Sequence, residues 1–382
     1  MNNIIPIITE QTHGNTWWFY ALSKSISQGA ANRRCKVEIY KQGLSSDQIM
    51  RLSNTVMVAS HSDDFLHETT QILKSAHKKP LLLSENGYFY GSGVSSVSAS
   101  HDQQARLAYS YLKQCDHVRI ALLGFRTDFQ RYLFEVLLKH AQKMSIDIPE
   151  SAIYYAHSSM DYFHRFIDEV HRYNAVICPN YQVALTLLSF CKAWNIRVPE
   201  DIYIIAYTNA IATEYTVPSI TTISIDAERF GQHCLDLWIK LMDAPHQEIS
   251  VCINLPVRLQ IRKSTDNIPY SGDQFASAVQ PLKPYKNSSL LVEDIAVDSS
   301  MYNLEKCLQQ CDSIDIDLIG LILQGVSYEA ISERLFISIG SLRYRVSKLY
   351  ANAGTENRKQ FERLFKLRLP VEGAFQPHKK QK

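Results

Sequence analysis

Short apolar segments alternate with helical patterns over the first 265 residues, and this alternation constrains the fold most strongly. Strands are predicted at Ile4–Thr9, Val37–Tyr40, Thr55–Ser60, Pro80–Ser84, Val118–Leu123, Ala175–Pro179 and Ile202–Tyr207. Amphipathic patterns indicate helices near 16–31, 64–76, 102–114, 130–145, 159–172, 182–195 and 227–242. Strands that alternate with helices form parallel sheets with helices on both faces, so an α/β fold is expected.

This stretch is longer than one such sheet usually needs, so two similar lobes are predicted. The last extended segment, Val251–Arg262, is interrupted by Pro256. Residues 266–289 are rich in Ser, Pro, Asp and Asn, which indicates a linker. Residues 290–311 are predicted to add one or two short helices, so that the whole linker covers residues 266–312.

Residues 314–368 contain four short helical patterns in succession. Gly325 lies where a left-handed C-terminal cap is expected after the first helix. Ser327, Ser338 and Thr355 are predicted to be the N-caps of the second, third and fourth helices. Only a two-residue turn separates the second helix from the third. This spacing is typical of the helix-turn-helix plan.

The third of these helices has one apolar side and one small or cationic side. At about 100° per residue, the predicted core stripe contains Ile339, Leu342, Val346, Leu349 and Tyr350. The opposite face contains Gly340, Arg343, Tyr344, Ser347, Lys348 and Ala351. Small residues allow a helix to lie deep in a major groove about 12 Å wide, while Arg and Lys reach phosphates or guanine edges.

Positive charge is concentrated at the C-terminal end of the chain. Residues 341–382 hold 11 Lys or Arg against 3 Asp or Glu, a balance of +8. The totals of 40 and 38 leave 29 against 35, a balance of −6, for residues 1–340. Phosphate binding requires such a positive potential, which favours double-stranded DNA as a partner. The alternative is a small helical bundle whose basic face is only solvated.

The run from Ile316 to Leu364 resembles the four-helix DNA-binding domain of the LuxR/GerE/NarL family. The anchors are Leu321, Gly325, Ser327, Glu329, Ile331, Leu335, Ser338, Leu342, Val346, Leu349 and Arg358. The resemblance implies that bases are contacted from Arg343, Tyr344 and Ser347. The full set of predicted DNA contacts is Ser341, Arg343, Tyr344, Ser347, Lys348 and Arg358. Ile339-Gly340-Ser341 replaces a usually polar triplet and Arg345 a frequent histidine, so the target sequence does not follow from relatives.

The first 265 residues resemble the sensor of LacI/GalR-type regulators, which has the two-lobed fold of periplasmic sugar-binding proteins. The matching segments are Asn180–Ala184 (NYQVA), Val198–Tyr207 (VPEDIYIIAY), Pro218–Ile223 (PSITTI) and Arg258–Thr265 (RLQIRKST). The resemblance implies a small-molecule effector, such as a sugar-like compound, between the lobes. The N-terminal DNA-binding headpiece of that family is expected to be absent, and the DNA-binding unit to lie at the C-terminus instead.

Candidate effector contacts follow the ends of predicted strands, where ligands bind in such folds. They are Trp17, Trp18, His61, Arg131, Asn180 and Asn209, together with the polar Glu10, Gln11, Thr12 and His13 after the first strand and Ser60, Ser62 and Asp63 after the third. Trp18 is equally well explained as a core aromatic residue, and His61 as a structural one. Ser100, Tyr181, Thr208 and Asn209 stand where relatives have aspartates, which weakens the case for a hydroxyl-rich sugar.

Other classes find little support in the sequence. There is no Gly-rich phosphate loop, HExxH or GxSxG motif, so no enzymatic activity, cofactor or metal is expected. No secretion signal or membrane span is apparent, which indicates a cytoplasmic protein. The eight cysteines are interpreted as free thiols, with a redox switch at Cys307 and Cys311 as the alternative.

These predictions combine into a two-lobed sensor (1–265), a linker (266–312), a helix-turn-helix domain (313–370) and a disordered basic tail (371–382). The expected function is a ligand-responsive transcription regulator that acts as a homodimer. Closure of the lobes around the effector would change the dimer interface, and with it the spacing of two recognition helices. The alternative function is a sensor whose helical domain docks to another protein.

Overall fold

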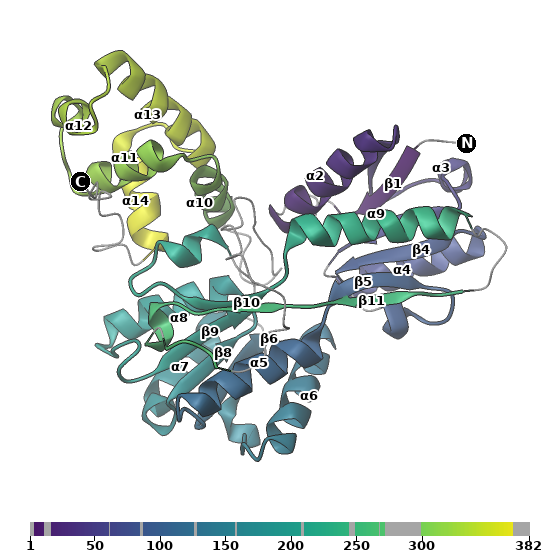
Figure 1. The fold of residues 1–382 in the computed structure, drawn as a ribbon, viewed down its shortest axis with the longest axis horizontal. Helices are drawn as coiled ribbons and strands as arrows, with labels where there is room; N and C mark the ends of the chain where they lie inside the picture. Colours follow the sequence, from purple (N-terminus) through teal and green to yellow (C-terminus); the bar gives the residue numbers. More distant parts are fainter. Residues whose placement is uncertain are drawn as a thin grey trace. The chain divides into compact units, whose positions relative to one another are not determined.

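The chain consists of two compact units (Figure 1). The computed structural model describes residues 4–10, 17–60, 62–84, 87–125, 128–156, 159–207, 210–243, 249–266, 268–271 and 299–369. Unit 1 contains the described residues of Met1–Gln103 and Ile225–Arg258. Unit 2 contains those of Gln104–Ser224, Leu259–Ser289 and Glu293–Lys382.

Unit 1 is built on a six-stranded sheet in the order β11-β5-β4-β3-β1-β2, and each neighbouring pair is parallel. The strands are β1 (Ile4–Thr9), β2 (Lys36–Lys41), β3 (Thr55–Ala59), β4 (Lys79–Ser84), β5 (Ser95–Ala99) and β11 (Cys252–Leu255). The helices are α2 (Trp17–Asn32), α3 (Ser46–Arg51), α4 (Asp63–Ser75), the short η1 (Gly87–Tyr90) and α9 (Ala227–Asp243).

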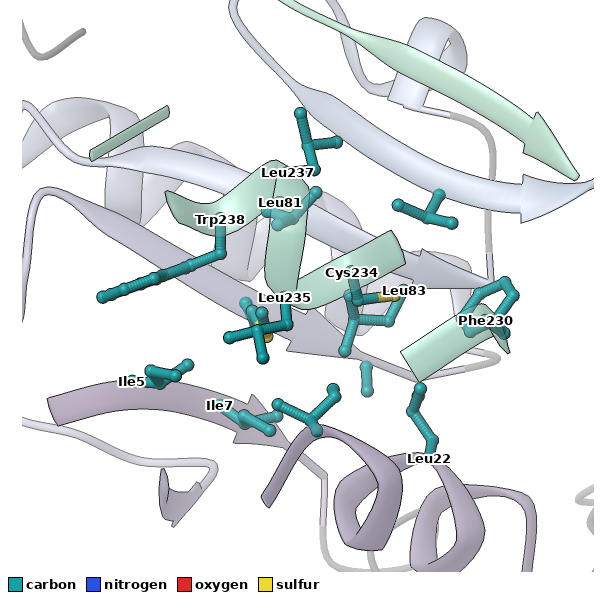
Figure 2. Packing of buried hydrophobic residues seen from close by; sticks show 14 of the residues in the cluster. Ile5, Ile7, Leu22, Leu81, Leu83, Phe230, Cys234, Leu235, Leu237 and Trp238 are labelled. Atoms are coloured by element: carbon teal, nitrogen blue, oxygen red, sulfur yellow. The ribbon is translucent and has the colours of Figure 1, made fainter. Parts of the chain in front are cut away.

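Two apolar cores lie on opposite faces of this sheet. On one face α2 and α9 pack over β1, β3 and β4, and Figure 2 shows Cys234 and Leu235 of α9 among these side chains. On the other face α3 and α4 contribute Ile49, Leu66 and Leu73. The helices α2 and α9 are closely packed, because a Cβ on Gly231 would lie 2.4 Å from the Ser25 hydroxyl oxygen.

Unit 2 contains a second six-stranded sheet, in the order β12-β10-β9-β8-β6-β7. Its strands are β6 (Ile120–Phe125), β7 (Ile153–Ala156), β8 (Ala175–Cys178), β9 (Tyr203–Tyr207), β10 (Thr221–Ser224) and β12 (Arg258–Gln260). The accompanying helices are α5 (His101–Gln114), α6 (Asp128–Lys143), α7 (Ser159–Glu169) and α8 (Tyr181–Ala193). Short helices are η2 (Glu150–Ala152), η3 (Val170–Arg172), η4 (Ile211–Glu214) and η5 (Lys263–Thr265).

Five further helices of unit 2 follow residue 298: α10 (Ser299–Gln309), α11 (Ser313–Leu323), α12 (Tyr328–Leu335), α13 (Ile339–Ala353) and α14 (Arg358–Arg368). Ser327 and Ser338 cap α12 and α13 as predicted, and Gly325 has the predicted positive φ of 79°. The predicted cap Thr355 is wrong. Asn357 caps α14, because its side chain accepts from the Gln360 N–H, whereas the Thr355 hydroxyl bonds the Tyr350 carbonyl.

All seven predicted strands and the predicted helices are present. The strands missed are β5, β7 and β10, and the helix missed is α3. Two of these strands, SSVSA and TTIS, are rich in hydroxyl residues that are buried in the sheet, so they lack an apolar pattern. No helix in the described part of the chain is long and apolar enough to span a membrane.

Candidate functional site

The turn between α12 and α13 is tight and well hydrogen-bonded. Phe336 ends α12 in the left-handed conformation, with φ 54°. The Ser332 hydroxyl donates to the Ile337 carbonyl at 2.6 Å, and Ser338 accepts from the Ser341 N–H at 3.2 Å. These bonds fix the direction in which α13 leaves the turn, which is the requirement for a recognition helix.

One side of α13 is buried and the other is exposed. Leu342, Val346 and Leu349 are buried, whereas all six residues of the predicted outer face are exposed: Gly340, Arg343, Tyr344, Ser347, Lys348 and Ala351. Ile339 was predicted to be in the core but is 40% exposed. It is the first residue of the helix, beyond the reach of the packed stripe. Within the described residues, Arg343 has no ion-pair or hydrogen-bond partner.

Arg345 is an internal residue of the helical group. Its guanidinium lies 2.9 Å from Asp312 and 2.6 Å from Asp315, whose carboxylate is almost fully buried. Hydrogen bonds to Asp315 and then Asp312 raise the pKa of Arg345. The two aspartates also form the capping box of α11. Arg345 therefore joins α13 to the start of α11.

Arg358, one of the predicted DNA contacts, is engaged in hydrogen bonds within the helical group. Its Nη2 donates to the Ile322 carbonyl in the last turn of α11, and its Nη1 donates to the Val326 carbonyl just after that helix, each at 2.8 Å. Its Nε donates to Glu362 at 2.7 Å. The guanidinium therefore satisfies the C-terminal carbonyls of a helix, a favourable position for a cation.

Lys348 and Ser341, two further predicted DNA contacts, differ in whether their side chains are hydrogen-bonded within the helical group. The Lys348 ammonium lies 3.3 Å from the Gln310 carbonyl, so it is partly engaged within the helical group. Ser341 is exposed, and its N–H is used by the Ser338 cap. Other exposed cations of this region are Arg334, Lys359, Arg363 and Lys366. The predicted basic tail lies outside the described residues.

Helix α10 belongs to the predicted linker, yet it packs against both α13 and η4. Its Glu305 side chain is fully buried, and burial raises the pKa of this carboxyl to about 7. The N–H groups of Ile211 and Ala212 in η4 donate to the two carboxylate oxygens, at 2.8 and 3.1 Å. The sequence did not indicate this role, because one glutamate in an amphipathic helix usually faces solvent.

The predicted effector contacts are only partly covered by the structure. Trp17 and Trp18 lie in α2 and Arg131 in α6, but their side chains are outside the described part. His61 and Asn209 lie outside the described residues. Asn180 follows β8 as predicted, but its side chain caps α8 by accepting from the Val183 N–H at 3.0 Å.

At the carboxyl edge of the unit 1 sheet, polar groups gather after β1 and β3. The buried Ser60 hydroxyl donates to Glu10 at 2.5 Å and accepts from the Ser62 N–H at 2.9 Å. Next to them the Tyr90 hydroxyl donates to Asp63 at 2.8 Å. Glu10, Ser60, Ser62 and Asp63 are therefore close to that edge as predicted, whereas Gln11, Thr12, His13 and His61 lie outside the described residues. They supply carboxylate and hydroxyl groups for a polar ligand.

At the corresponding edge of the unit 2 sheet lie two tyrosines. Tyr207 ends β9 and Tyr181 follows β8, and burial raises the pKa of each phenol well above its usual value. Both groups therefore stay neutral. At Tyr181, where the sequence resemblance places an aspartate, the structure therefore has a neutral phenol in place of an ionised acceptor. This chemistry fits a flat or apolar ligand group better than a hydroxyl-rich sugar.

An apolar pocket in unit 2 lies at the opposite end of the sheet. It is lined by Leu188, Cys191, Lys192, Ile196, Val198, Val217 and Pro218. Two of the loops that line it precede β9 and β10, so it lies at the amino ends of these strands. Ligands of such sheets bind beyond the carboxyl ends. This pocket is therefore separate from the predicted effector residues.

The described residues include no group of three or more His, Cys, Asp or Glu that could hold a metal ion. Cys307 is buried, and its thiol lies 3.5 Å from the Leu349 carbonyl. The Cys311 thiol donates to the Cys307 carbonyl, and its hydrogen bonding with Cys307, with burial, raises the pKa of Cys311. A raised pKa favours the unreactive thiol, which argues against the redox-switch alternative.

Comparison with known proteins supports the fold and the sensor resemblance. A model described as a periplasmic binding protein-like domain matches residues 109–265. The chain is 24% identical over 223 residues to the transcriptional repressor PurR of Serratia proteamaculans, covering 56% of this chain and 63% of that protein. It is 31% identical over 106 residues to NtdR, a biosynthesis operon regulator of Bacillus subtilis, covering 27% and 31%.

Solved structures give the same fold. The transcription regulator CcpA of Lactococcus lactis superposes with a TM-score of 0.57 at 16% identity, covering 69% of this chain and 99% of that one. The regulator CelR in complex with cellobiose gives 0.58 at 18% identity, covering 69% and 84%. The two-sheet α/β fold, similar to that of periplasmic binding proteins, is thus confirmed, and the relatives named here are transcription regulators. The matching family model ends at residue 265, before α10.

Proposed function

We propose that this protein is a ligand-responsive transcription regulator that binds double-stranded DNA through α12 and α13. One observation carries the proposal: α13 follows a tight turn and exposes Arg343, Tyr344 and Ser347 on a face with small neighbours. The relatives that share the sensor fold are regulators, which supports this function. The four helices α11–α14 are proposed to be a LuxR-type domain, on the residues of that resemblance.

The effector is proposed to be a small molecule bound at the carboxyl ends of the sheet strands. Trp17, Trp18, His61, Arg131 and Asn209 remain proposed contacts. Asn180 is less available, because its side-chain oxygen already caps α8. The protein is proposed to act as a homodimer, since two recognition helices about one helical turn of DNA apart would contact two half-sites.

The test is selection of duplexes from a random-sequence library by the full-length protein at physiological salt. An enriched motif with two-fold symmetry supports a dimeric, sequence-specific regulator. Arg343→Ala should then weaken binding to the selected site, while Lys359→Ala serves as the matched control, because that exposed lysine of α14 is not among the predicted DNA contacts. Binding without enrichment, which disappears as salt rises, contradicts sequence-specific recognition.

A second function, docking to another protein, is favoured by exposed aromatic side chains. Phe336 is 90% exposed and Tyr344 is 72% exposed, close to the turn before α13. Exposed aromatic residues are common at protein interfaces. If docking is the function, Phe336→Ala should abolish capture of the partner, and Arg343→Ala should leave binding to any duplex unchanged.

A further inference from the structure

Helix α10 bridges η4, which follows the sensor strand β9, and the proposed recognition helix α13. Two residues of α10 lie against α13. The Cys307 thiol is 3.5 Å from the Leu349 carbonyl oxygen, and the Asn303 amide lies so close to Gly354 that an added Cβ would be 2.5 Å from its nitrogen. Any shift of α10 must therefore be accommodated by α13.

The contact of α10 with η4 is centred on Glu305. The η4 helix starts after Ala210, which has no side chain able to cap it. Glu305 supplies the missing acceptors from a distant part of the chain, because its two oxygens accept from the N–H groups of Ile211 and Ala212. Gln309 holds the same carboxylate from within α10, at 3.1 Å.

The position of η4, just after strand β9, makes this contact relevant to the effector. Ile211 follows Tyr207, the last residue of β9, by four positions, so η4 leaves from the carboxyl edge of the sheet. Ligands of parallel α/β sheets bind at this edge. A ligand that repositions the segment after β9 also repositions the two N–H groups that hold Glu305.

We propose that Glu305 is a positioning residue that couples the segment after β9 to the DNA-binding face of α13 by capping η4 from α10. The inference rests on the proposed function, in which α13 binds DNA. It adds the route by which the sensor controls that site. A purely structural anchor would hold α10 in place but would not respond to DNA.

Reciprocity allows a test before the effector is identified. If two sites are coupled, each must change the free energy of binding at the other by the same amount. Binding of DNA to α13 must then change the stability of the hydrogen bonds at Ile211 and Ala212. Because these amides donate directly to Glu305, their hydrogen exchange reports on the contact itself.

The experiment compares amide exchange of the full-length protein with and without the selected duplex. The proteins are the wild type, Glu305→Ala, Glu305→Gln and the matched control Gln310→Ala, whose exposed side chain lies just beyond α10. In wild type and control, the duplex should change exchange at residues 211–212 by at least about fivefold. In Glu305→Ala these amides should exchange rapidly, and the duplex should no longer change them.

Glu305→Gln keeps one acceptor oxygen and should give an intermediate response, which protects the test against a variant that fails to fold. Unchanged exchange at residues 211–212 in the wild type on DNA binding overturns the inference. So does a response that persists in Glu305→Ala. If the library yields no enriched duplex, the proposed function fails, and the inference fails with it. If a duplex is enriched but exchange at residues 211–212 does not respond to it, only the inference fails.

Discussion

The two sides of α13 use arginine in opposite ways. Arg345 is held by two aspartates of the α11 capping box, one of them almost fully buried. Arg343, two residues earlier, is exposed and has no charged partner in the described part of the chain. One cation therefore stabilises the helical group, and the other is available for a phosphate or a base. Cationic composition alone does not distinguish these roles, because position around the helix decides them.

The largest expected effect is on the paired side. Arg345→Met should lower the free energy of unfolding by roughly 3 kcal/mol, because the buried Asp315 carboxylate loses its counter-ion. Denaturant unfolding followed by circular dichroism measures this effect. The double variant with Asp315→Asn should recover part of the loss. An Arg345→Met protein as stable as wild type would show that the ion pair contributes nothing to stability, and Arg345 would then not differ from Arg343 in this respect.

On the exposed side, Arg343→Ala should cost about 1–3 kcal/mol of binding to the selected duplex. Its free energy of unfolding should change by less than about 0.5 kcal/mol, as expected for an exposed position. Fluorescence anisotropy over a range of salt concentrations measures the affinity and the number of phosphate contacts. A loss of stability without a loss of DNA affinity would show that Arg343, like Arg345, stabilises the helical group and does not contact DNA.

Glu305 adds a pH dependence to the packed side of α13. Its folded pKa is about 7, above the ordinary 4.5, so the stability linked to it is fully present below pH 4.5 and is lost as pH rises through 7. The facing groups are Glu214 of η4, paired with Arg262, and Tyr181 of α8. Between pH 5 and 8 the loss should be about 2–3 kcal/mol, at about 1.4 kcal/mol for each pH unit between the two pKa values.

Unfolding of wild type and Glu305→Gln across this pH range measures that dependence. The glutamine variant should lack it between pH 5 and 8, because its amide does not titrate there. A pH profile that is identical in the two proteins would assign the dependence to other groups.

The smallest expected effect is at the turn. Phe336 occupies the left-handed conformation that glycine adopts without strain, so Phe336→Gly should relieve strain and lose no buried surface. The greater freedom of glycine in the unfolded chain offsets this gain, and the net stabilisation should be a few tenths of a kcal/mol. Urea unfolding detects it, with Phe336→Ala as the control that keeps the strain. A clear destabilisation would show that the exposed ring has contacts of its own.

Local patterns predicted most of the architecture. Apolar runs such as Ile4–Thr9 predicted the strands. Single residues such as Ser327, Ser338 and Gly325 predicted the helix ends, because the capping preferences of serine and glycine depend only on neighbouring residues. The hydroxyl-rich strand β5 was missed, since its burial depends on neighbouring strands and not on its own composition.

The candidate site was less accessible to sequence analysis, because its key contacts join distant residues. Arg358 has the charge of a DNA contact, but its partners are carbonyls 32 and 36 residues away. Glu305 reaches N–H groups more than 90 residues away. Periodicity places such residues on a helix face, but it does not identify what packs against that face.

The return of α9 to unit 1 has a consequence for synthesis of the chain. The core formed by β1, β3, β4 and α2 is completed by Phe230, Leu235 and Trp238, and the sheet by β11. A ribosome makes these segments only after the five strands β6–β10 of unit 2. One apolar face of the first 103 residues therefore stays uncovered until about residue 255 has emerged from the ribosome. During this interval unit 1 is exposed to aggregation and depends most on chaperones.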